Sequence, residues 1–335
     1  MEYRQLTRDG TKVSAIGLGT WPFGGGMGAI DDQSVIAITR AAIDNGINLI
    51  DTAQVYGVSE ERLGKALKDG YRNRCFLATK VWREQDNDYS PPAIYAAMED
   101  SLRKLNVDYV DLYQIHHPDP SFPIDQTMEA LERLREQGKT RYIGVSNFWV
   151  EHMEEALKTA PLHTNQPRYN MLDRRVEAEV LPFCERNGIG VMAHSPLAKG
   201  LLTGRYRVGH VFPEDDERAR LTRFRGEPFA HYVNVAVQLK QIAADKGLSL
   251  IQMAVGWLLR LPSVSCVLVG AKHPGQVTEH LGAAGVAFTA DELDRIDTIL
   301  ENTPATLYDD YGRNYLSNSR GFMIAHKGKD DGGIQ

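Results

Sequence analysis

Short apolar segments alternate with longer segments of helical periodicity along almost the whole chain. Apolar segments of this length are typical of buried strands, and the periodic segments have the single apolar face of helices that pack on a sheet. The alternation therefore predicts a parallel sheet joined by crossover helices. We expect strands at residues 16–21, 47–51, 75–80, 110–115, 142–146, 163–166, 190–194 and 265–269. We expect helices at residues 32–45, 60–69, 91–105, 125–137, 150–159, 174–187, 229–246, 249–260, from 274 onward and at 290–301.

Capping residues support several of these boundaries. Asp31 or Asp32, Ser59 and Asp173 stand where a side-chain oxygen can accept from the first free N–H groups of a helix. Gly46 follows the end of the first expected helix, and a glycine is common there because it adopts a left-handed conformation without strain.

The most consistent architecture is a single closed (β/α)8 barrel, known as a TIM barrel, with a doubly wound sheet as the main rival. A short hairpin at residues 3–6 and 12–15 precedes the barrel, and a long loop at 197–227 follows the seventh strand. We expect the barrel to occupy residues 1–303 as the catalytic domain. Residues 304–335 form a C-terminal tail whose end we expect to be disordered.

Composition excludes several classes of partner. The 335 residues include 38 basic and 44 acidic side chains, a net charge of −6, which gives no electrostatic case for binding nucleic acid or an anionic membrane. The first residues lack the apolar core of a signal peptide, and no apolar run reaches the ~18 residues that a membrane span needs. Cys75, Cys184 and Cys266 are scattered, which argues against disulfides or a zinc site and favours a cytoplasmic location. The pattern leaves the oligomeric state open.

Polar side chains stand at the carboxyl ends of four consecutive expected strands: Asp51 with Tyr56 just beyond it, Lys80, His116, and the pair Ser146 and Asn147. In a barrel these ends converge on one mouth, where such enzymes carry their chemistry. Each residue alone has an ordinary explanation, such as a structural ion pair or packing. Their joint position on the correct edge is what favours a site.

The chemistry that this set predicts is proton donation. A free tyrosine has a pKa of about 10, and a neighbouring ammonium lowers it by stabilising the phenolate. Lys80 would supply that ammonium, Asp51 its counter-charge, and His116 a hydrogen bond that orients a carbonyl oxygen. We therefore expect carbonyl reduction without a metal or a covalent nucleophile.

Two stretches raise the question of a dinucleotide. Gly17 and Gly19 suggest a Rossmann fingerprint, but Pro22 occupies the position of its third glycine and no helix follows directly. The loop at 269–276 is the better phosphate candidate, because it leads into a helix and carries Lys272, which suits the 2′-phosphate of NADP. An ordinary loop with a solvated lysine explains that stretch equally well.

Six motifs together resemble the aldo-keto reductase superfamily, of the bacterial NADP-dependent type, from Gly17 to about Leu300. They are residues 16–21 (IGLGTW), 50–57 (IDTAQVYG), 78–80 (ATK), 111–116 (DLYQIH), 143–148 (IGVSNF) and 195–204 (SPLAKGLLTG). The resemblance implies a TIM barrel that uses NADP(H), less often NAD(H), to interconvert a small-molecule carbonyl and its alcohol.

The resemblance also implies roles for individual residues. Tyr56 would be the general acid and base, tuned by Lys80 and Asp51, with His116 positioning the substrate. The cofactor would be bound along the mouth. Its nicotinamide would contact Ser146, Asn147, Gln166 and His194, its pyrophosphate Ser195, Leu197, Lys199, Gly200 and Arg205, and its adenosine end Gly270, Lys272, Gln276, Glu279 and His280. Trp21 would also contact the cofactor.

Three histidines depart from the family pattern. His117 stands where tryptophan is common, His194 where a tyrosine commonly stacks under the nicotinamide, and His280 where asparagine is usual. A positive charge on His194 would disfavour the cationic oxidised cofactor, so its protonation would affect the direction of reaction.

We expect an aromatic substrate pocket, partly covered by the C-terminal tail and lined by Trp21, Phe23, Trp82, His117 and Phe148, about half of which pack the barrel instead. Aldehydes, ketoses, polyols and ring ketones all remain open as substrates. Two other functions remain open as well: a catalytically silent, cofactor-binding regulatory or structural barrel, and an isomerase or lyase that uses Lys80 as a Schiff base.

Overall fold

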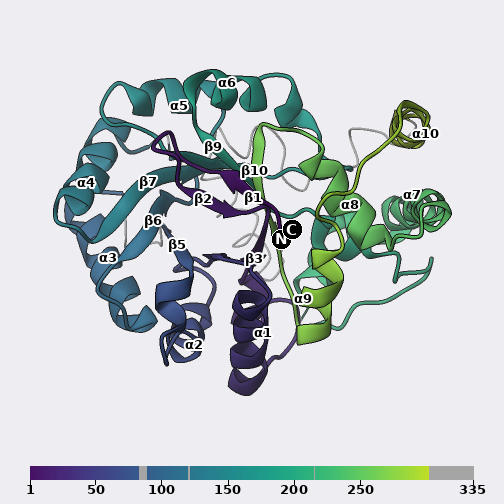
Figure 1. The fold of residues 1–335 in the computed structure, drawn as a ribbon, viewed down its shortest axis with the longest axis horizontal. Helices are drawn as coiled ribbons and strands as arrows, with labels where there is room; N and C mark the ends of the chain where they lie inside the picture. The colour runs from purple at the N-terminus through teal and green to yellow at the C-terminus, as the bar shows by residue number, and fades with distance from the viewer. Residues whose placement is uncertain (83–88, 120, 215, 302–335) are drawn as a thin grey trace, which may run out of the picture.

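The computed structural model describes residues 1–82, 89–119, 121–214 and 216–301. Its centre is a closed barrel of parallel strands, surrounded by helices (Figure 1). In order around the barrel the strands are β3 (Ile16–Gly19), β4 (Leu49–Asp51), β5 (Phe76–Val81), β6 (Val110–Ile115), β7 (Thr140–Ser146), β8 (Thr164–Gln166), β9 (Gly190–Ala193) and β10 (Val264–Val269). β10 pairs with β3, with Val267 opposite Ile16, so the sheet closes. This closure confirms the (β/α)8 prediction and excludes the doubly wound sheet.

Helices follow the strands and pack their apolar faces outside the barrel. They are α1 (Asp32–Asp44), α2 (Ser59–Ala66), α3 (Pro91–Leu105), α4 (Ile124–Glu136), α5 (Val150–Leu157), α6 (Val180–Asn187), α7 (Gly226–Asp245), α8 (Leu250–Leu259), α9 (Pro274–Leu281) and α10 (Ala290–Glu301). α10 lies beside α7, where Lys246 contacts Glu292 at 2.8 Å and Arg295 contacts Asp245 at 3.0 Å. Among the described helices none alone is long and apolar enough to cross a membrane, although α7 and α8, bent by 85°, meet that criterion as a pair.

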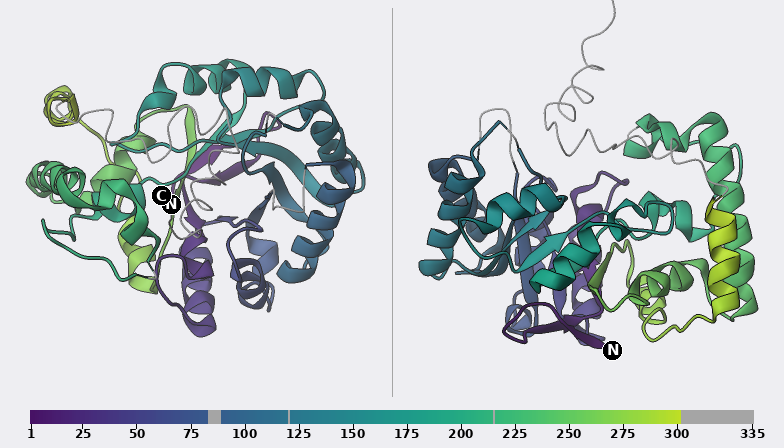
Figure 2. Two further views of the ribbon diagram at one scale, coloured as in Figure 1. Left: turned by 180° about the vertical axis from the view of Figure 1, so that it is seen from behind. Right: turned by 90° about the horizontal axis from the view of Figure 1, so that it is seen from above.

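A short hairpin, β1 (Tyr3–Gln5) and β2 (Lys12–Ser14), closes the end of the barrel opposite the strands' carboxyl termini (Figures 1 and 2). Leu6 and Val13 from this hairpin join a buried cluster with Leu49, Leu112 and Leu268 inside the barrel. Gly190 allows the contact, because a Cβ there would lie 2.0 Å from the carbonyl oxygen of Leu6. The end formed by the carboxyl termini of the strands is therefore the one that can hold a functional site.

Three predicted boundaries are wrong, two of them at the first strand and the second helix. The first strand ends at Gly19, and Trp21–Gly24 form a 3-10 turn (η1) in which Pro22 has no N–H for a sheet. Ser59 is not an N-cap; Val58 is, and the buried Ser59 hydroxyl lies 2.9 Å from Thr20 Oγ1.

The segment 174–187 is not one helix. It divides into η3 (Arg175–Glu177) and α6, and Asp173 accepts from the Arg175 side chain instead of capping a helix. By contrast, the predicted cap at Asp31 is confirmed, since its Oδ1 accepts from Ser34 N at 2.7 Å.

The long loop after β9 forms three 3-10 turns, η4 (Ala198–Thr203), η5 (Glu217–Arg220) and η6 (Thr222–Phe224). Aromatic side chains of this loop pack against Phe229 of α7 and join the main hydrophobic core. Phe212 lies 5.3 Å from Phe224 and 5.8 Å from Phe229 between ring centroids. This packing holds the loop beside the mouth of the barrel. The predicted C-terminal tail lies outside the described residues.

Candidate active site

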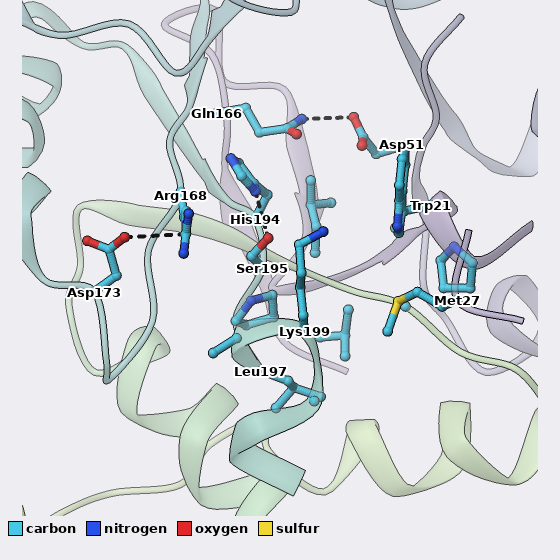
Figure 3. A pocket seen from close by; sticks show the side chains of 18 of the residues that line it. Trp21, Met27, Asp51, Gln166, Arg168, Asp173, His194, Ser195, Leu197 and Lys199 are labelled. Carbon is cyan, nitrogen blue, oxygen red and sulfur yellow. Dashed lines mark hydrogen bonds and ion pairs between the residues drawn. The ribbon is translucent and has the colours of Figure 1, made fainter. Parts of the chain in front are cut away.

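The strands' carboxyl ends surround a cavity of about 1410 Å³ (Figure 3). Most of the predicted site residues line it: Trp21, Asp51, Tyr56, Trp82, His116, His117, Asn147, Phe148, Gln166, His194, Ser195, Leu197, Lys199, Gly200, Arg205, Gly270, Lys272, Gln276 and His280. The prediction that Phe23 lines the pocket is wrong, because its side chain is fully buried in the hydrophobic core. Lys80, Ser146 and Glu279 lie next to the cavity without lining it.

Lys80 lies fully buried under the cavity and connects three oxygen atoms. Its Nζ donates to Asp51 Oδ2 at 2.6 Å, to the Thr52 carbonyl at 2.8 Å and to Tyr56 Oη at 3.3 Å. Burial lowers the pKa of Lys80, but the negative charge of Asp51 and the contact with Tyr56 outweigh it, so the pKa is raised. Lys80 is therefore a stable ammonium at neutral pH.

Tyr56 lies between two aromatic rings, with centroids 4.9 Å from Trp21 and 5.6 Å from His116. Burial raises the pKa of Tyr56, and the charge of Lys80 offsets only part of that rise. The pKa of Tyr56 is therefore raised, whereas the sequence predicted that it would be lowered. Tyr56 thus remains protonated at neutral pH. Because the ammonium donates to Oη, the hydroxyl proton is directed away from Lys80.

The second carboxylate oxygen of Asp51 accepts from two amides. Gln166 Nε2 donates to Oδ1 at 2.8 Å, as Figure 3 shows, and Gln114 Nε2 lies 3.5 Å from the same atom. Sequence reasoning assigned Gln166 to the cofactor alone and missed Gln114. The strand pattern could have predicted it. Alternate residues of a strand point to the same side, so Gln114, two residues after Leu112, also points into the barrel.

His116, His117 and Trp82 form one wall of the cavity. The two imidazoles are stacked at 5.0 Å, and the Trp82 ring meets their edges at 5.0 and 5.3 Å. Burial, aided by the charge of Lys80, lowers the pKa of His117 to about 3, and burial holds the pKa of His116 well below its usual value. Both rings are therefore neutral at physiological pH.

His194 is fixed by two hydrogen bonds. Its Nε2 lies 2.9 Å from Asn147 Oδ1 and its Nδ1 lies 3.0 Å from Ser195 Oγ. Asn147 Nδ2 donates to the His116 carbonyl, so the Asn147 oxygen faces His194 and accepts from Nε2. Burial, with the charge of Arg168, holds the pKa of His194 well below its usual value. His194 is neutral at pH 7, so it does not carry the positive charge that would disfavour the oxidised cofactor.

Backbone strain is concentrated at this mouth. Non-glycine residues with positive φ include Asn147 at 61°, Ser195 at 56°, Ala198 at 48° and Lys199 at 55°, all of which line the cavity. Such conformations cost about 1–3 kcal/mol each and persist where the surrounding structure holds them, often at binding sites.

The predicted phosphate-binding side chains are held by neighbouring protein groups. Glu217 Oε1 accepts from Lys199 Nζ at 2.8 Å and from Trp21 Nε1 at 3.0 Å. Lys272 Nζ donates to the Met27 carbonyl at 2.8 Å, while Gln276 Oε1 accepts from the Lys272 N–H at 2.7 Å. Among the described residues, no group of three or more His, Cys, Asp or Glu side chains is arranged to hold a metal ion.

A model of the aldo/keto reductase family matches residues 15–301, which are most of the chain and nearly all of the barrel. The chain belongs to the aldo/keto reductase family. This membership confirms the resemblance inferred from the six motifs, and it accounts for the closed barrel with the site at the carboxyl ends of its strands.

Relatives of this chain include proteins named for carbonyl and alcohol chemistry. "Aldo-keto reductase YhdN" of Bacillus subtilis is 41% identical over 90% of this chain and 95% of its own length. "NADH-specific methylglyoxal reductase" of Escherichia coli is 35% identical over 82% of this chain and 90% of its own. The solved structure of the glycerol dehydrogenase AKR11B4 from Gluconobacter oxydans superposes with a TM-score of 0.81 at 37% identity, covering 90% of this chain and 95% of that one.

Acid should destabilise the folded protein between pH 7 and pH 5. The folded-state pKa values of His116, His117 and His194 lie below the unfolded value of about 6.5, so the unfolded chain binds protons first. The stability that the neutral rings provide is complete above pH ~6.5. Below pH ~6.5, each of these histidines lowers the free energy of unfolding by about 1.4 kcal/mol per pH unit.

Urea unfolding of wild type and His194→Gln at pH 7 and pH 5 checks this expectation. The variant has one fewer such histidine, so it should lose about 2 kcal/mol less than wild type between the two pH values. Comparing each protein with itself removes the effect of the lost hydrogen bonds. An equal loss in both proteins would mean that His194 is not held neutral in the folded state.

Proposed function

We propose that this aldo/keto reductase reduces an aldehyde or ketone to an alcohol with NADPH, reversibly, and that Tyr56 donates the proton to the carbonyl oxygen. The observation that carries the proposal is the buried Lys80 ammonium, which donates to Tyr56 Oη at 3.3 Å and to Asp51 at 2.6 Å. A protein that only binds a dinucleotide has no need of this arrangement. The relatives named methylglyoxal reductase and glycerol dehydrogenase support the same class of reaction.

In this mechanism the side chains of the site transfer one proton to the substrate. Tyr56 is protonated at neutral pH, and its proton points away from Lys80, towards the cavity. As negative charge develops on a carbonyl oxygen, the proton moves from Oη to that oxygen and leaves a phenolate. The Lys80 ammonium stabilises the phenolate, and Asp51 with its two glutamine donors fixes Lys80. His116 stays neutral and orients the carbonyl group.

The cavity fits a dinucleotide with phosphate groups. Seven basic and three acidic side chains line it among the described residues, although the whole chain carries a net charge of −6. Ser195, Leu197, Lys199, Gly200 and Arg205 would hold the pyrophosphate, and Lys272 and Gln276 the adenosine end. When bound, the cofactor supplies the hydride. Asn147, Gln166 and His194 would orient the nicotinamide, with Ser146 behind them.

Lys272→Ala should weaken NADPH binding by about 10- to 100-fold and change NADH binding by less than about threefold. The reason is that a charge-assisted contact to the 2′-phosphate is worth about 1.5–3 kcal/mol, and NADH has no such phosphate. Fluorescence titration of both cofactors against both proteins measures the effect. Equal losses for the two cofactors would refute the assignment of Lys272.

Turnover separates this function from the regulatory alternative. Purified protein is titrated with NADPH and NADH, and oxidation of NADPH is then followed with a panel of aldehydes, ketones and sugars. The proposal predicts tight NADPH binding and turnover of at least one carbonyl compound. Tight binding with no turnover across the panel would favour a regulatory barrel.

A Schiff-base role for Lys80 is disfavoured. That chemistry needs a neutral amine, whereas the pKa of Lys80 is raised and its Nζ already donates to three oxygen atoms. Borohydride trapping with an aldehyde should therefore leave Lys80 unlabelled. We also propose a cytoplasmic location, which is supported by the free and buried thiols of Cys75, Cys184 and Cys266.

A further inference from the structure

A second group of charged residues lines the cavity away from Trp21 and Asp51. Arg168 and Asp173 lie on the loop after β8 and Arg175 begins η3, and Figure 3 shows Arg168 and Asp173 on the opposite side of the cavity from Trp21 and Asp51. The cofactor, under the function proposed above, accounts for Lys199, Arg205 and Lys272. It gives no role to Arg168 or Arg175.

Asp173 is the centre of this group. Its side chain is 3% exposed, and Arg175 engages both of its oxygens at 2.9 Å while Arg168 Nε approaches Oδ2 at 3.3 Å. Burial would raise the pKa of Asp173, yet Arg175, Arg168 and Arg223 together hold it below its usual value. Asp173 is the one carboxylate at this end among the described residues that line the cavity.

Arg168 lies close to the position assigned to the nicotinamide. It is two residues beyond Gln166, and its backbone pairs with His194 in a parallel bridge. The charge of Arg168 is, after burial, the largest cause of the low pKa of His194. The positive charge therefore acts on the part of the cavity that His194 lines, and the His194 ring itself is neutral.

We propose that Arg168, supported by Asp173 and Arg175, binds an anionic group of the substrate, so that carbonyl compounds carrying a carboxylate or a phosphate are preferred over neutral ones. The proposal rests on the proposed reductase function. A guanidinium offers a planar set of donors that matches either anion, and a second arginine behind the same aspartate fixes its orientation. The positive lining also raises the local concentration of anionic substrates.

Matched substrate pairs test the preference. 4-Carboxybenzaldehyde is compared with 4-formylbenzamide, which has nearly the same shape without the charge, and glyceraldehyde 3-phosphate is compared with glyceraldehyde. Wild type should show a kcat/KM at least about tenfold higher for the anionic member of one pair. The pair that shows the larger ratio distinguishes a carboxylate from a phosphate.

Arg168→Gln should lower kcat/KM for the preferred anionic member by about 10- to 100-fold and leave its neutral partner within about twofold. Arg168→Lys retains the charge without the planar donors and should lose less. Arg207→Gln is the matched control, since it removes the same charge from an exposed position of the η4–η5 loop that does not line the cavity. The Kd for NADPH should be unchanged in all three variants.

Three results would overturn the proposal: no anionic preference in wild type, an equal loss for both members of a pair in Arg168→Gln, or a raised Kd for NADPH in that variant. If wild type reduces no member of either pair, the reductase proposal loses support instead. The anion site is then tested by binding alone. The Kd values of 4-carboxybenzyl alcohol and 4-(hydroxymethyl)benzamide are measured on the NADPH-loaded protein, and the preference for the carboxylate should be present in wild type and lost in Arg168→Gln.

Discussion

Tyr56→Phe should lower kcat for carbonyl reduction by about 10³-fold and leave the Kd for NADPH nearly unchanged. The substitution removes only the hydroxyl group, so the ring keeps its contacts with Trp21 and His116 at 4.9 and 5.6 Å. Among the described residues, it removes the one group beside Lys80 that both faces the cavity and carries a proton. General acid catalysis contributes typically about 10²–10⁴-fold, which sets the expected loss.

Single-turnover absorbance with saturating NADPH measures this step, and fluorescence titration measures binding. The matched control is Tyr206→Phe, a tyrosine that also lines the cavity but whose Oη accepts from Arg218 at 2.6 Å, far along the chain from Lys80. The control should keep kcat within about twofold. A Tyr56→Phe variant that retained more than about a tenth of wild-type kcat would exclude Tyr56 as the general acid.

Lys80→Met should lower the free energy of unfolding by about 3–5 kcal/mol, because it leaves the charge of Asp51 buried without a counter-charge. Asp51 is 3% exposed and Lys80 fully buried in the pair that joins them at 2.6 Å. Urea unfolding at pH 7 measures the loss. The variant should also lose most of its turnover, since Lys80 is the cation whose charge favours the phenolate of Tyr56.

The double variant Asp51→Asn with Lys80→Met separates charge from packing. Removing both charges should recover at least about 2 kcal/mol of the loss, since the remaining amide needs no counter-charge. Activity should not return with stability. A single variant Lys80→Met that lost less than about 1 kcal/mol would show that the pair is not an electrostatic anchor of the site.

The rule that parallel strands meet at one mouth predicted much of the site from sequence. Asp51, Lys80 and His116 each follow or end an apolar strand, and the barrel brings them together as expected. Tyr56 lies in the loop that follows the first of these strands, and Gly24 allows the neighbouring turn to approach it closely, with a Cβ there only 2.3 Å from the Tyr56 carbonyl oxygen.

The failures come from burial and side-chain contacts, which the periodicity of a segment does not encode. Phe23 is aromatic and near the mouth, but its ring is buried in the core. The segment 174–187 has helical periodicity, yet Asp173 is held by arginine side chains and the helix starts only at Val180. The pKa of Tyr56 rises because burial outweighs Lys80, and the extent of burial cannot be predicted from the spacing of residues.

The most direct test of the proposed function is to trace the hydride from NADPH to the alcohol product. NADPH deuterated at nicotinamide C4 is incubated with purified protein and a panel of aldehydes and ketones, and the products are analysed by mass spectrometry and NMR. We expect one deuterium on the former carbonyl carbon, from only one of the two C4 positions, and no label from Tyr56→Phe on the same timescale. Tight NADPH binding with no deuterium transferred to any carbonyl compound would contradict the proposed function.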